Sequence, residues 1–209
     1  MTSKRERNSL STSLRSCRNY RTKQIKCEYM FAHVSFILVP VLFQILTIKK
    51  NVMNPEIGIK KGNLSKVAQV LSSFLADEFL LYLKTRNAHW NIEGSDFHAM
   101  HKFFESQYEQ LDVIMDDVAE RIRSLGHYAP ATLKDYLELT HLTEQSREKN
   151  DSAGFIKELL GDHESIITRL RENINHFAND LQDMGTSDFI TGLMETHEKI
   201  AWMLRAHLP

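Results

Sequence analysis

The chain has 209 residues, of which 42% are hydrophobic and 25% are charged, with only 8 glycines and 4 prolines. This composition is typical of a globular protein and excludes a wholly disordered or collagen-like chain. Residues 53–209 carry sixteen basic and twenty-five acidic side chains, whereas residues 1–52 carry ten and two. An acidic body attracts cations and repels nucleic acid, so the main part of the chain favours metal binding over DNA binding.

Residues 1–52 form a basic and apolar extension that matches no standard targeting segment. The largely apolar run 30–48 is interrupted by polar residues and ends at Lys49 and Lys50 without a small-residue cleavage site. It is therefore not typical of a signal peptide, and it only just reaches the roughly 20 apolar residues of a membrane span. We expect this extension to be disordered or the product of a misassigned start, with Met53 as the true start. A basic DNA-binding tail and a membrane anchor are the alternatives.

Apolar residues recur every three or four positions through most of the remaining chain, which predicts helices. The expected helices are 64–90, 97–125, a short one at 131–139, 153–181 and a last one capped by Ser187. Ser95 or Asp96 is the expected N-cap of the second helix, and Gly126 its end. The last helix is expected to bury Phe189, Leu193, Ile200, Trp202 and Leu204.

Residues 53–209 contain nothing typical of a strand. Four long helices, with a short extra helix in the connection between the second and third, predict an all-α fold of the ferritin-like four-helix-bundle type. We therefore divide the chain into the extension 1–52 and one ferritin-like domain, 53–209.

The second expected helix carries a polar stripe made of His101, Glu105, Asp116 and Glu120. At about 100° per residue, these positions fall at roughly 0°, 40°, 60° and 100° around the helix axis. Both cysteines lie in the extension, so a metal in the main domain must bind His, Asp or Glu. Such ligands suit iron, manganese or zinc. A solvated charged face is the alternative interpretation of the stripe.

The length of the helix limits how the stripe can bind metal. Glu105 and Asp116 lie about 16 Å apart along the axis, at ~1.5 Å per residue, so one chain cannot close both around one ion. Two copies packed antiparallel about a two-fold axis near residues 110 and 111 would set the first ligand pair of one chain opposite the second pair of the other.

A metal site inside a single bundle is the rival arrangement. It needs two glutamates and two Glu-x-x-His pairs. Residues 53–209 contain one such pair, Glu138-Leu-Thr-His141, in a connecting segment. The sequence therefore disfavours the site within the bundle.

The segment Ala88-His89-Trp90-Asn91-Ile92-Glu93-Gly94, followed by Phe97, His101 and Asp116-Asp-Val-Ala-Glu120-Arg-Ile-Arg-Ser-Leu-Gly126, closely resembles the Dps family of bacterial mini-ferritins. The spacings of 12, 4, 11 and 4 along His89, His101, Glu105, Asp116 and Glu120 match the ferroxidase ligands of that family. The resemblance covers nearly all of residues 53–209 and none of 1–52.

The resemblance implies a cytoplasmic ferroxidase and iron-storage protein, assembled as a hollow dodecamer from two-fold dimers. Each site would bind two iron ions and oxidise Fe(II), preferably with hydrogen peroxide, and the cage would store ferric mineral and protect against oxidative stress. In each site, His89, His101 and Glu105 would come from one subunit and Asp116 and Glu120 from its mate. Glu105 departs from the pattern of the family, because several members have Asp at this position.

Further roles follow from the same resemblance. Trp90 would lie beside the site and intercept radicals, with simple packing as its alternative role. Asp180, Asp183 and Asp188 around the turn into the last helix are candidates for lining a three-fold entry pore. Nucleoid DNA binding through the N-terminal tail, with iron oxidation secondary, is the alternative function, and no membrane partner is expected. Structural roles are expected for His98, His127, His163, His176, His197 and His207.

Overall fold

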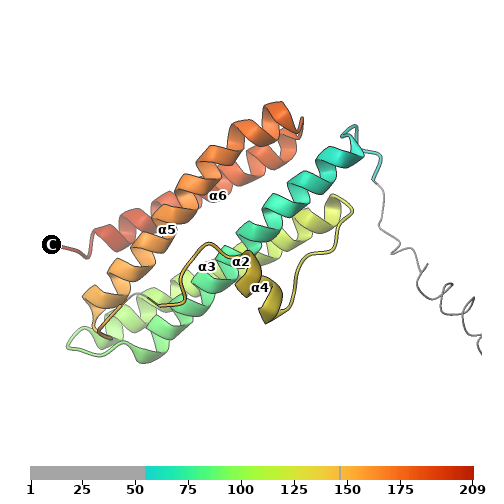
Figure 1. Cartoon of the computed structure of the whole chain (residues 1–209). Coiled ribbons are helices and arrows are strands. Elements are labelled where there is room, and N and C mark those ends of the chain that lie inside the picture. Colours follow the sequence, from blue (N-terminus) through green and yellow to red (C-terminus); the bar gives the residue numbers. More distant parts are fainter. Residues whose placement is uncertain (1–54, 146) are drawn as a thin grey trace, which may run out of the picture. The chain divides into compact units, whose positions relative to one another are not determined.

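The computed structural model describes residues 55–145 and 147–209, and the expectations for the extension 1–52 lie outside this part. The described residues contain no strand. Their helices are α2 (Lys61–Asn91), α3 (Phe97–Ser124), α4 (Leu133–Leu139), α5 (Ser152–Asn175) and α6 (Met184–Arg205), with a π-helix, η1 (His176–Asp180), between α5 and α6. The all-α bundle with a short extra helix between the second and third long helices is confirmed (Figure 1).

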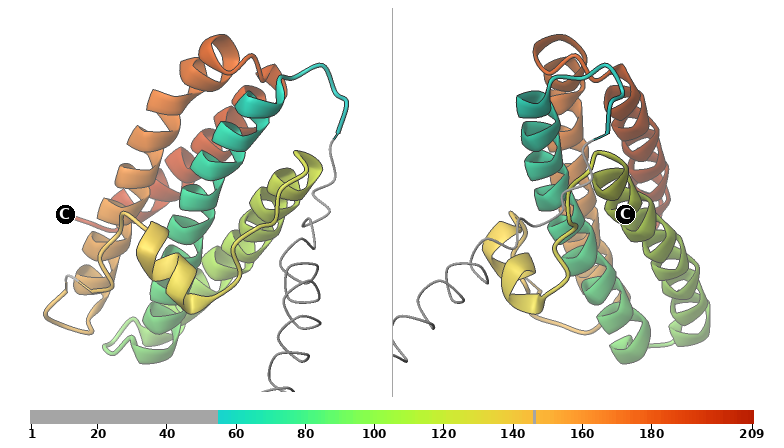
Figure 2. Two further views of the ribbon diagram at one scale, coloured as in Figure 1. Left: turned by 45° about the vertical axis from the view of Figure 1, so that its right-hand side comes forward. Right: turned by 90° about the vertical axis from the view of Figure 1, so that its right-hand side faces the viewer.

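The four long helices form two pairs of neighbours. Helix α2 packs mainly against α3, and α5 packs mainly against α6. Helix α4 lies outside the bundle, beside α2 (Figure 2). The ring of Phe79 on α2 stacks on Tyr136 of α4, with centroids 4.4 Å apart, so the short helix is attached to α2 through an aromatic contact.

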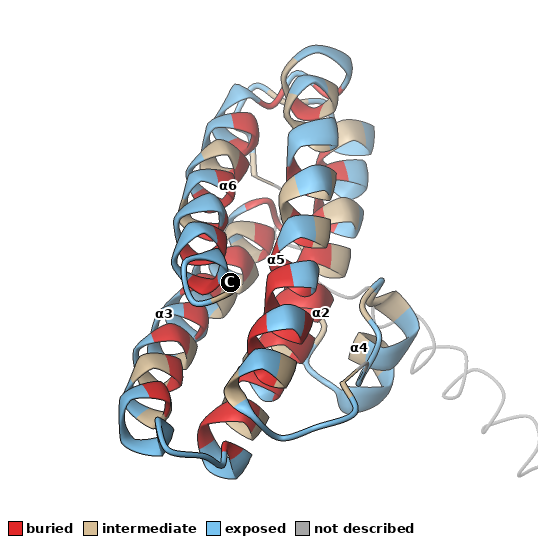
Figure 3. Ribbon diagram, turned by 90° about the vertical axis from the view of Figure 1, so that its left-hand side faces the viewer, coloured by how far each residue is buried: buried red, intermediate tan, exposed pale blue. Residues whose placement is uncertain are grey.

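The buried residues lie on the inward faces of the long helices (Figure 3). Among them are Phe74 of α2, Phe104 of α3, Phe155 of α5 and Phe177 of η1, all fully buried. Burying one such ring contributes roughly 1.5–3 kcal/mol. The three- and four-residue spacing of apolar residues in the sequence corresponds to these inward faces.

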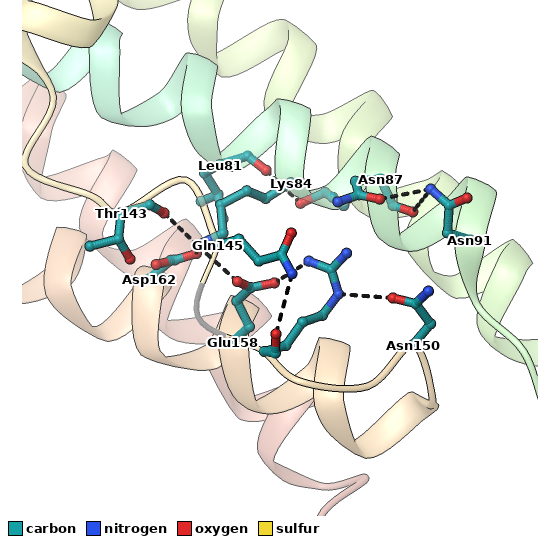
Figure 4. Close-up of polar contacts among 11 residues, drawn as sticks. Leu81, Lys84, Asn87, Asn91, Thr143, Gln145, Asn150, Glu158 and Asp162 are labelled. Carbon is teal, nitrogen blue, oxygen red and sulfur yellow. Dashed lines mark hydrogen bonds and ion pairs between the residues drawn. The ribbon is translucent and has the colours of Figure 1, made fainter.

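A buried ion network fixes the long connection between α3 and α5 to the bundle (Figure 4). Lys84 of α2 is 2% exposed, and its Nζ lies 2.6 Å from Asp162 and 3.5 Å from Glu158 on α5. The same Nζ donates to the backbone oxygen of Thr143 at 2.9 Å. Arg147 completes the network with a 2.8 Å contact to Glu158. Two cations, Lys84 and Arg147, thus face two carboxylates, Glu158 and Asp162, so each buried charge has a partner of opposite sign.

The start of the last helix differs from the expectation. Asp183, not Ser187, is the N-cap, and its side chain accepts a hydrogen bond from the backbone N–H of Thr186 at 2.9 Å. The chain reaches this cap from η1 through Gln182, whose φ is 56°. Ser187 lies inside the helix, where its hydroxyl donates to the backbone oxygen of Ile174 at 2.9 Å. Aspartate and serine both cap helices well, so residue type alone does not distinguish Asp183 from Ser187.

Trp202 was also placed wrongly, because it is 62% exposed. The buried face of α6 runs through Leu193, His197, Ile200 and Leu204. Trp202 follows Ile200 by two positions, or about 200° around the axis, which turns it away from this face. In the described part of the chain, none of the helices combines the length and apolarity that crossing a membrane requires.

Candidate metal centre

The candidate site begins with two histidines that face each other across the α2–α3 connection. His89 is near the end of α2 and His101 is in the second turn of α3. Their rings stack, with centroids 3.8 Å apart and an interplanar angle of 21°. The Nδ1 of each ring lies 2.8 Å from the backbone oxygen of the other residue.

These contacts define which nitrogen of each ring can bind a metal. A carbonyl oxygen only accepts hydrogen bonds, so Nδ1 carries the proton in both rings. In the neutral rings, Nε2 of His89 and of His101 therefore has a free lone pair. Fixing one ring nitrogen by a backbone carbonyl is the usual way in which proteins orient a metal-binding imidazole.

Glu105 lies one helical turn beyond His101 and is paired with Lys102. The Nζ of Lys102 lies 2.6 Å from Oε2 of Glu105. This hydrogen bond lowers the pKa of Glu105, and its electrostatic interactions with His89 and His101 act in the same direction. The three expected ligands of one chain are thus close enough to interact, and Glu105 is held as a carboxylate.

Asp116 and Glu120 lie farther along α3 and are exposed. Asp116 lines a groove of about 430 Å³ between α2, α3 and α4, together with Leu75, Phe79, Asp112, Val113, Met115, Ala119 and Tyr136. Within residues 55–145 and 147–209, no three His, Cys, Asp or Glu side chains of one chain are placed to hold a metal ion. The structure brings His89 and His101 into contact, and Glu105 interacts electrostatically with both; these three residues are called the half-site below. Asp116 and Glu120 of the same chain do not join them in a metal-holding group.

A group of aromatic residues beside His89 was missed by the sequence reasoning. The guanidinium carbon of Arg86 lies 4.4 Å from the ring centroid of Tyr108, 5.0 Å from that of Trp90 and 5.7 Å from that of Tyr82. Tyr82, Arg86 and Trp90 are spaced by four residues, which is a signal for one helix face. Tyr108 comes from α3, so its place in the group depends on helix packing.

The interior of the bundle contains polar residues of another kind. His163 and His197 are fully buried, with their Nδ1 atoms 2.9 Å apart, and Nε2 of His197 lies 3.0 Å from Glu78. Burial, with His197 nearby, holds the pKa of His163 well below its usual range. This chain of contacts links α2, α5 and α6, which gives the two histidines the structural role expected for them.

The other acidic candidates have different surroundings. Asp183 is buried, caps α6 and pairs with Arg121 at 3.1 Å, so a pore-lining role for this residue is wrong. Asp180 is exposed and lies 2.8 Å from Nδ1 of His176. Glu138, of the single Glu-x-x-His pair, lies on α4 and contacts Lys134 at 3.7 Å.

Comparison with known proteins places the chain and its fold in a family. The Ferritin-like domain family matches residues 68–209. The chain is 39% identical to a low-temperature-induced protein of Nostoc sp. over 73% of this chain and 86% of the relative. It is 34% identical to the DNA protection during starvation protein of Helicobacter pylori, over 68% of this chain and 99% of the relative.

Solved structures agree with this result. The Dps protein of Vibrio cholerae O1, described as a member of the ferritin-like diiron-carboxylate proteins, aligns with a TM-score of 0.70 and 29% identity, covering 77% of this chain and all of that one. A Dps protein of Bacillus brevis aligns with a TM-score of 0.67 and 29% identity over 72% of this chain. The bundle is thus of the ferritin-like class. Within that class, the chain belongs to the Dps family.

Proposed function

We propose that this protein is a ferroxidase that oxidises Fe(II), preferably with hydrogen peroxide, and stores the ferric product as mineral. The observation that carries the proposal is the reciprocal pairing of His89 and His101, which engages Nδ1 of each ring and leaves Nε2 of each ring for a metal, near the carboxylate of Glu105. Imidazole and carboxylate donors suit iron in both oxidation states. Consuming Fe(II) and peroxide together would limit oxidative damage.

Asp116 and Glu120 of a second chain would complete each site, which would bind two iron ions. The distance along α3 supports this arrangement, because 11 residues separate Glu105 from Asp116 and span about 16 Å. A two-fold axis crossing the middle of α3 would create two equal sites per dimer. Each carboxylate pair would then face the histidines of the other chain.

The surface around α4 supports a homodimer. Several large apolar side chains are exposed on the three helices that line the groove, namely Leu83 on α2, Val113 on α3, and Leu133 and Leu137 on α4. Exposed apolar residues on such a surface are typical of a protein–protein interface. A dodecamer built from these dimers follows the family pattern and belongs to the proposal.

DNA protection is the second candidate function, because the Helicobacter pylori relative carries that name. Residues 53–209 are acidic, so contact with DNA would depend on the basic extension 1–52. A salt-dependent gel shift with the full chain and with a chain starting at Met53 tests it. Loss of binding with the shorter chain supports the tail, and no binding by either chain rules out protection by contact.

Iron oxidation is tested by mixing the assembled protein with Fe(II) and hydrogen peroxide and following ferric absorbance. The double variant His101→Ala with Asp116→Ala should lose the activity, because it removes one ligand from each half of the site. The matched control is His176→Ala with Asp117→Ala. His176 lies on η1, and Asp117 points about 100° away from Asp116 around α3. Equal rates in the two double variants would contradict the proposed site.

A further inference from the structure

We propose that Asp96 and Ser152 are positioning residues for the half-site, because their contact fixes the α2–α3 turn to the start of α5. The turn, residues 92–96, lies between His89 and His101 along the chain. The inference rests on the proposed function, since it assigns both residues a part in binding Fe(II) at that site. Neither residue belongs to the expected ligand set.

The carboxylate of Asp96 does not cap the helix that it precedes. Asp96 is at the N-cap position of α3, where an aspartate normally accepts a hydrogen bond from the first turn. Within Phe97–Ser124, all of which the structure describes, no backbone N–H donates such a bond to it. At the starts of α4, α5 and α6, a backbone N–H does donate to the N-cap side chain, which is that of Thr132, Asp151 and Asp183. The Asp96 carboxylate is therefore used for a different contact.

Ser152, the first residue of α5, provides that contact. Its hydroxyl donates a hydrogen bond to Oδ2 of Asp96. Close by in the chain, the backbone N–H of Glu93 donates to the backbone oxygen of Asn150 at 3.0 Å. Gly94 has a φ of 135°, and a Cβ atom there would lie 3.1 Å from Oδ1 of Asp96, so glycine suits both the backbone and the carboxylate. Two hydrogen bonds thus tie the turn to the segment that leads into α5.

This segment is itself anchored to the bundle (Figure 4). Nε of Arg147 donates to Oδ1 of Asn150 at 3.3 Å, and its Nη1 lies 2.8 Å from Oε2 of Glu158. The guanidinium carbon of Arg147 lies 4.2 Å from the ring centroid of Phe155. Phe155 in turn meets Phe104 of α3 edge-on, with centroids 6.1 Å apart. The α2–α3 turn is therefore attached to a part of the chain that packs on the core.

The half-site depends on how the end of α2 lies relative to the start of α3. The Nδ1 atoms of His89 and His101 each lie 2.8 Å from the other residue's backbone oxygen, so any movement of one helix end stretches both bonds. A metal ligand must be held within about 0.5 Å of its productive position. Because the turn is the covalent link between the two histidines, its attachment to α5 restricts their relative movement. Loss of the Asp96–Ser152 contact should weaken Fe(II) binding without removing a ligand.

The same contact should add little to the stability of the fold. Asp96 is exposed and Ser152 is half-buried, so water replaces the lost partner when the hydrogen bond is removed. An effect on Fe(II) binding can therefore be measured apart from an effect on the free energy of unfolding.

The test is anaerobic Fe(II) titration of the assembled full chain in a double-mutant cycle of Ser152→Ala and Asp96→Ala. On its own, Ser152→Ala should weaken Fe(II) binding roughly 10-fold, the lower end of the loss for an outer partner of metal ligands. Added to Asp96→Ala, it should cause no further loss, because the contact is already absent. The cycle thus separates the contact from the charge that Asp96→Ala also removes. Ser152→Thr keeps the hydroxyl and should keep the affinity.

Ser187→Ala is the matched control. It also deletes one hydroxyl that joins two helices, since Ser187 of α6 donates to the backbone oxygen of Ile174 at 2.9 Å. Ile174 and Ser152 are near opposite ends of α5, so this contact is remote from the α2–α3 turn. Ser187→Ala should leave Fe(II) affinity unchanged. Chemical denaturation of each variant should show that Ser152→Ala lowers the free energy of unfolding no more than Ser187→Ala does.

The outcomes separate this inference from the proposed function. If the wild-type protein binds no Fe(II), the proposed function fails and this inference fails with it. If it binds Fe(II), three results overturn only the present inference: unchanged affinity in Ser152→Ala, an equal loss when Ser152→Ala is added to Asp96→Ala, or the same loss in Ser187→Ala. The wild-type titration distinguishes the two cases.

Discussion

His89 and His101 hold each other through two reciprocal hydrogen bonds, because the Nδ1 of each ring donates to the backbone oxygen of the other at 2.8 Å. Each bond contributes about 1 kcal/mol. Together they tie the end of α2 to the start of α3. They also fix the protonated nitrogen of both rings before any metal arrives, so the half-site is organised by the fold of one chain.

Removing one of these rings should weaken Fe(II) binding strongly. His101→Ala deletes a ligand and one of the two reciprocal bonds. Losing only an outer hydrogen-bond partner of a metal ligand typically costs roughly 10–100-fold in affinity, and we expect at least that loss here. Anaerobic Fe(II) titration measures it, with His98→Ala as the control, because His98 is exposed in the first turn of the same helix. Unchanged affinity in His101→Ala would exclude this residue as a ligand.

Lys102 should compete with iron for Glu105. Its Nζ lies 2.6 Å from the carboxylate and lowers the pKa of Glu105, so a metal must displace this contact. In Lys102→Gln, the pKa of Glu105 should rise toward its usual value, and Fe(II) should bind more tightly at neutral pH. Lys134→Gln removes a comparable exposed pair with Glu138 on α4 and should have no effect. Weaker binding in Lys102→Gln would contradict the competition.

Lys84 should be essential for stability. Lys84→Met leaves Asp162 and Glu158 buried without this cation, and breaking a buried ion pair costs about 3–5 kcal/mol. Burial raises the pKa of Asp162, and Lys84 opposes that rise, so the variant should also take up a proton at Asp162 more readily. Chemical denaturation measures the loss.

The control for Lys84 is an exposed ion pair. Arg171 contacts Glu198 on the surface, with both side chains largely exposed. Such a pair is worth roughly 0–1 kcal/mol, so Arg171→Met should change the free energy of unfolding little. Equal losses in the two variants would show that the buried network has no special role.

His163 should make the fold sensitive to acid. Its pKa in the folded chain is well below 6.5, chiefly because of burial. Below about pH 6.5, the unfolded chain therefore binds a proton that the folded chain does not. As the pH is lowered, the free energy of unfolding decreases by at most about 1.4 kcal/mol per pH unit. This contribution is fully present above that pH. Denaturation midpoints at several pH values should show a smaller acid loss in His163→Gln than in the wild-type protein or in the exposed-site variant His207→Gln.

The helices and the half-site were predictable because both depend on periodicity along one chain. Apolar spacing located the bundle helices, and the four-residue step from His101 to Glu105 placed them on one face. The rise per residue along the helix was enough to show that Glu105 and Asp116 of one chain cannot bind the same ion. None of these arguments needs knowledge of which helices are neighbours.

The remaining features depend on contacts between helices, which the sequence does not specify. Tyr108 joins Arg86 only because α2 and α3 pack side by side, and His163 meets His197 only because α5 packs on α6. The cap of α6 was missed for a different reason. Asp183 and Ser187 both satisfy the capping rule, and the choice depends on the turn through Gln182.

The central claim is that each metal site is shared by two chains, and mixed assemblies test it most directly. His101→Ala inactivates one half of the site and Asp116→Ala the other, so assemblies of either variant alone should be inactive. Random pairing after co-expression makes half of the dimers mixed, each with one intact site, so about one quarter of the wild-type activity should return. If the mixed assemblies oxidise Fe(II) no faster than the separate variants, the shared site is contradicted.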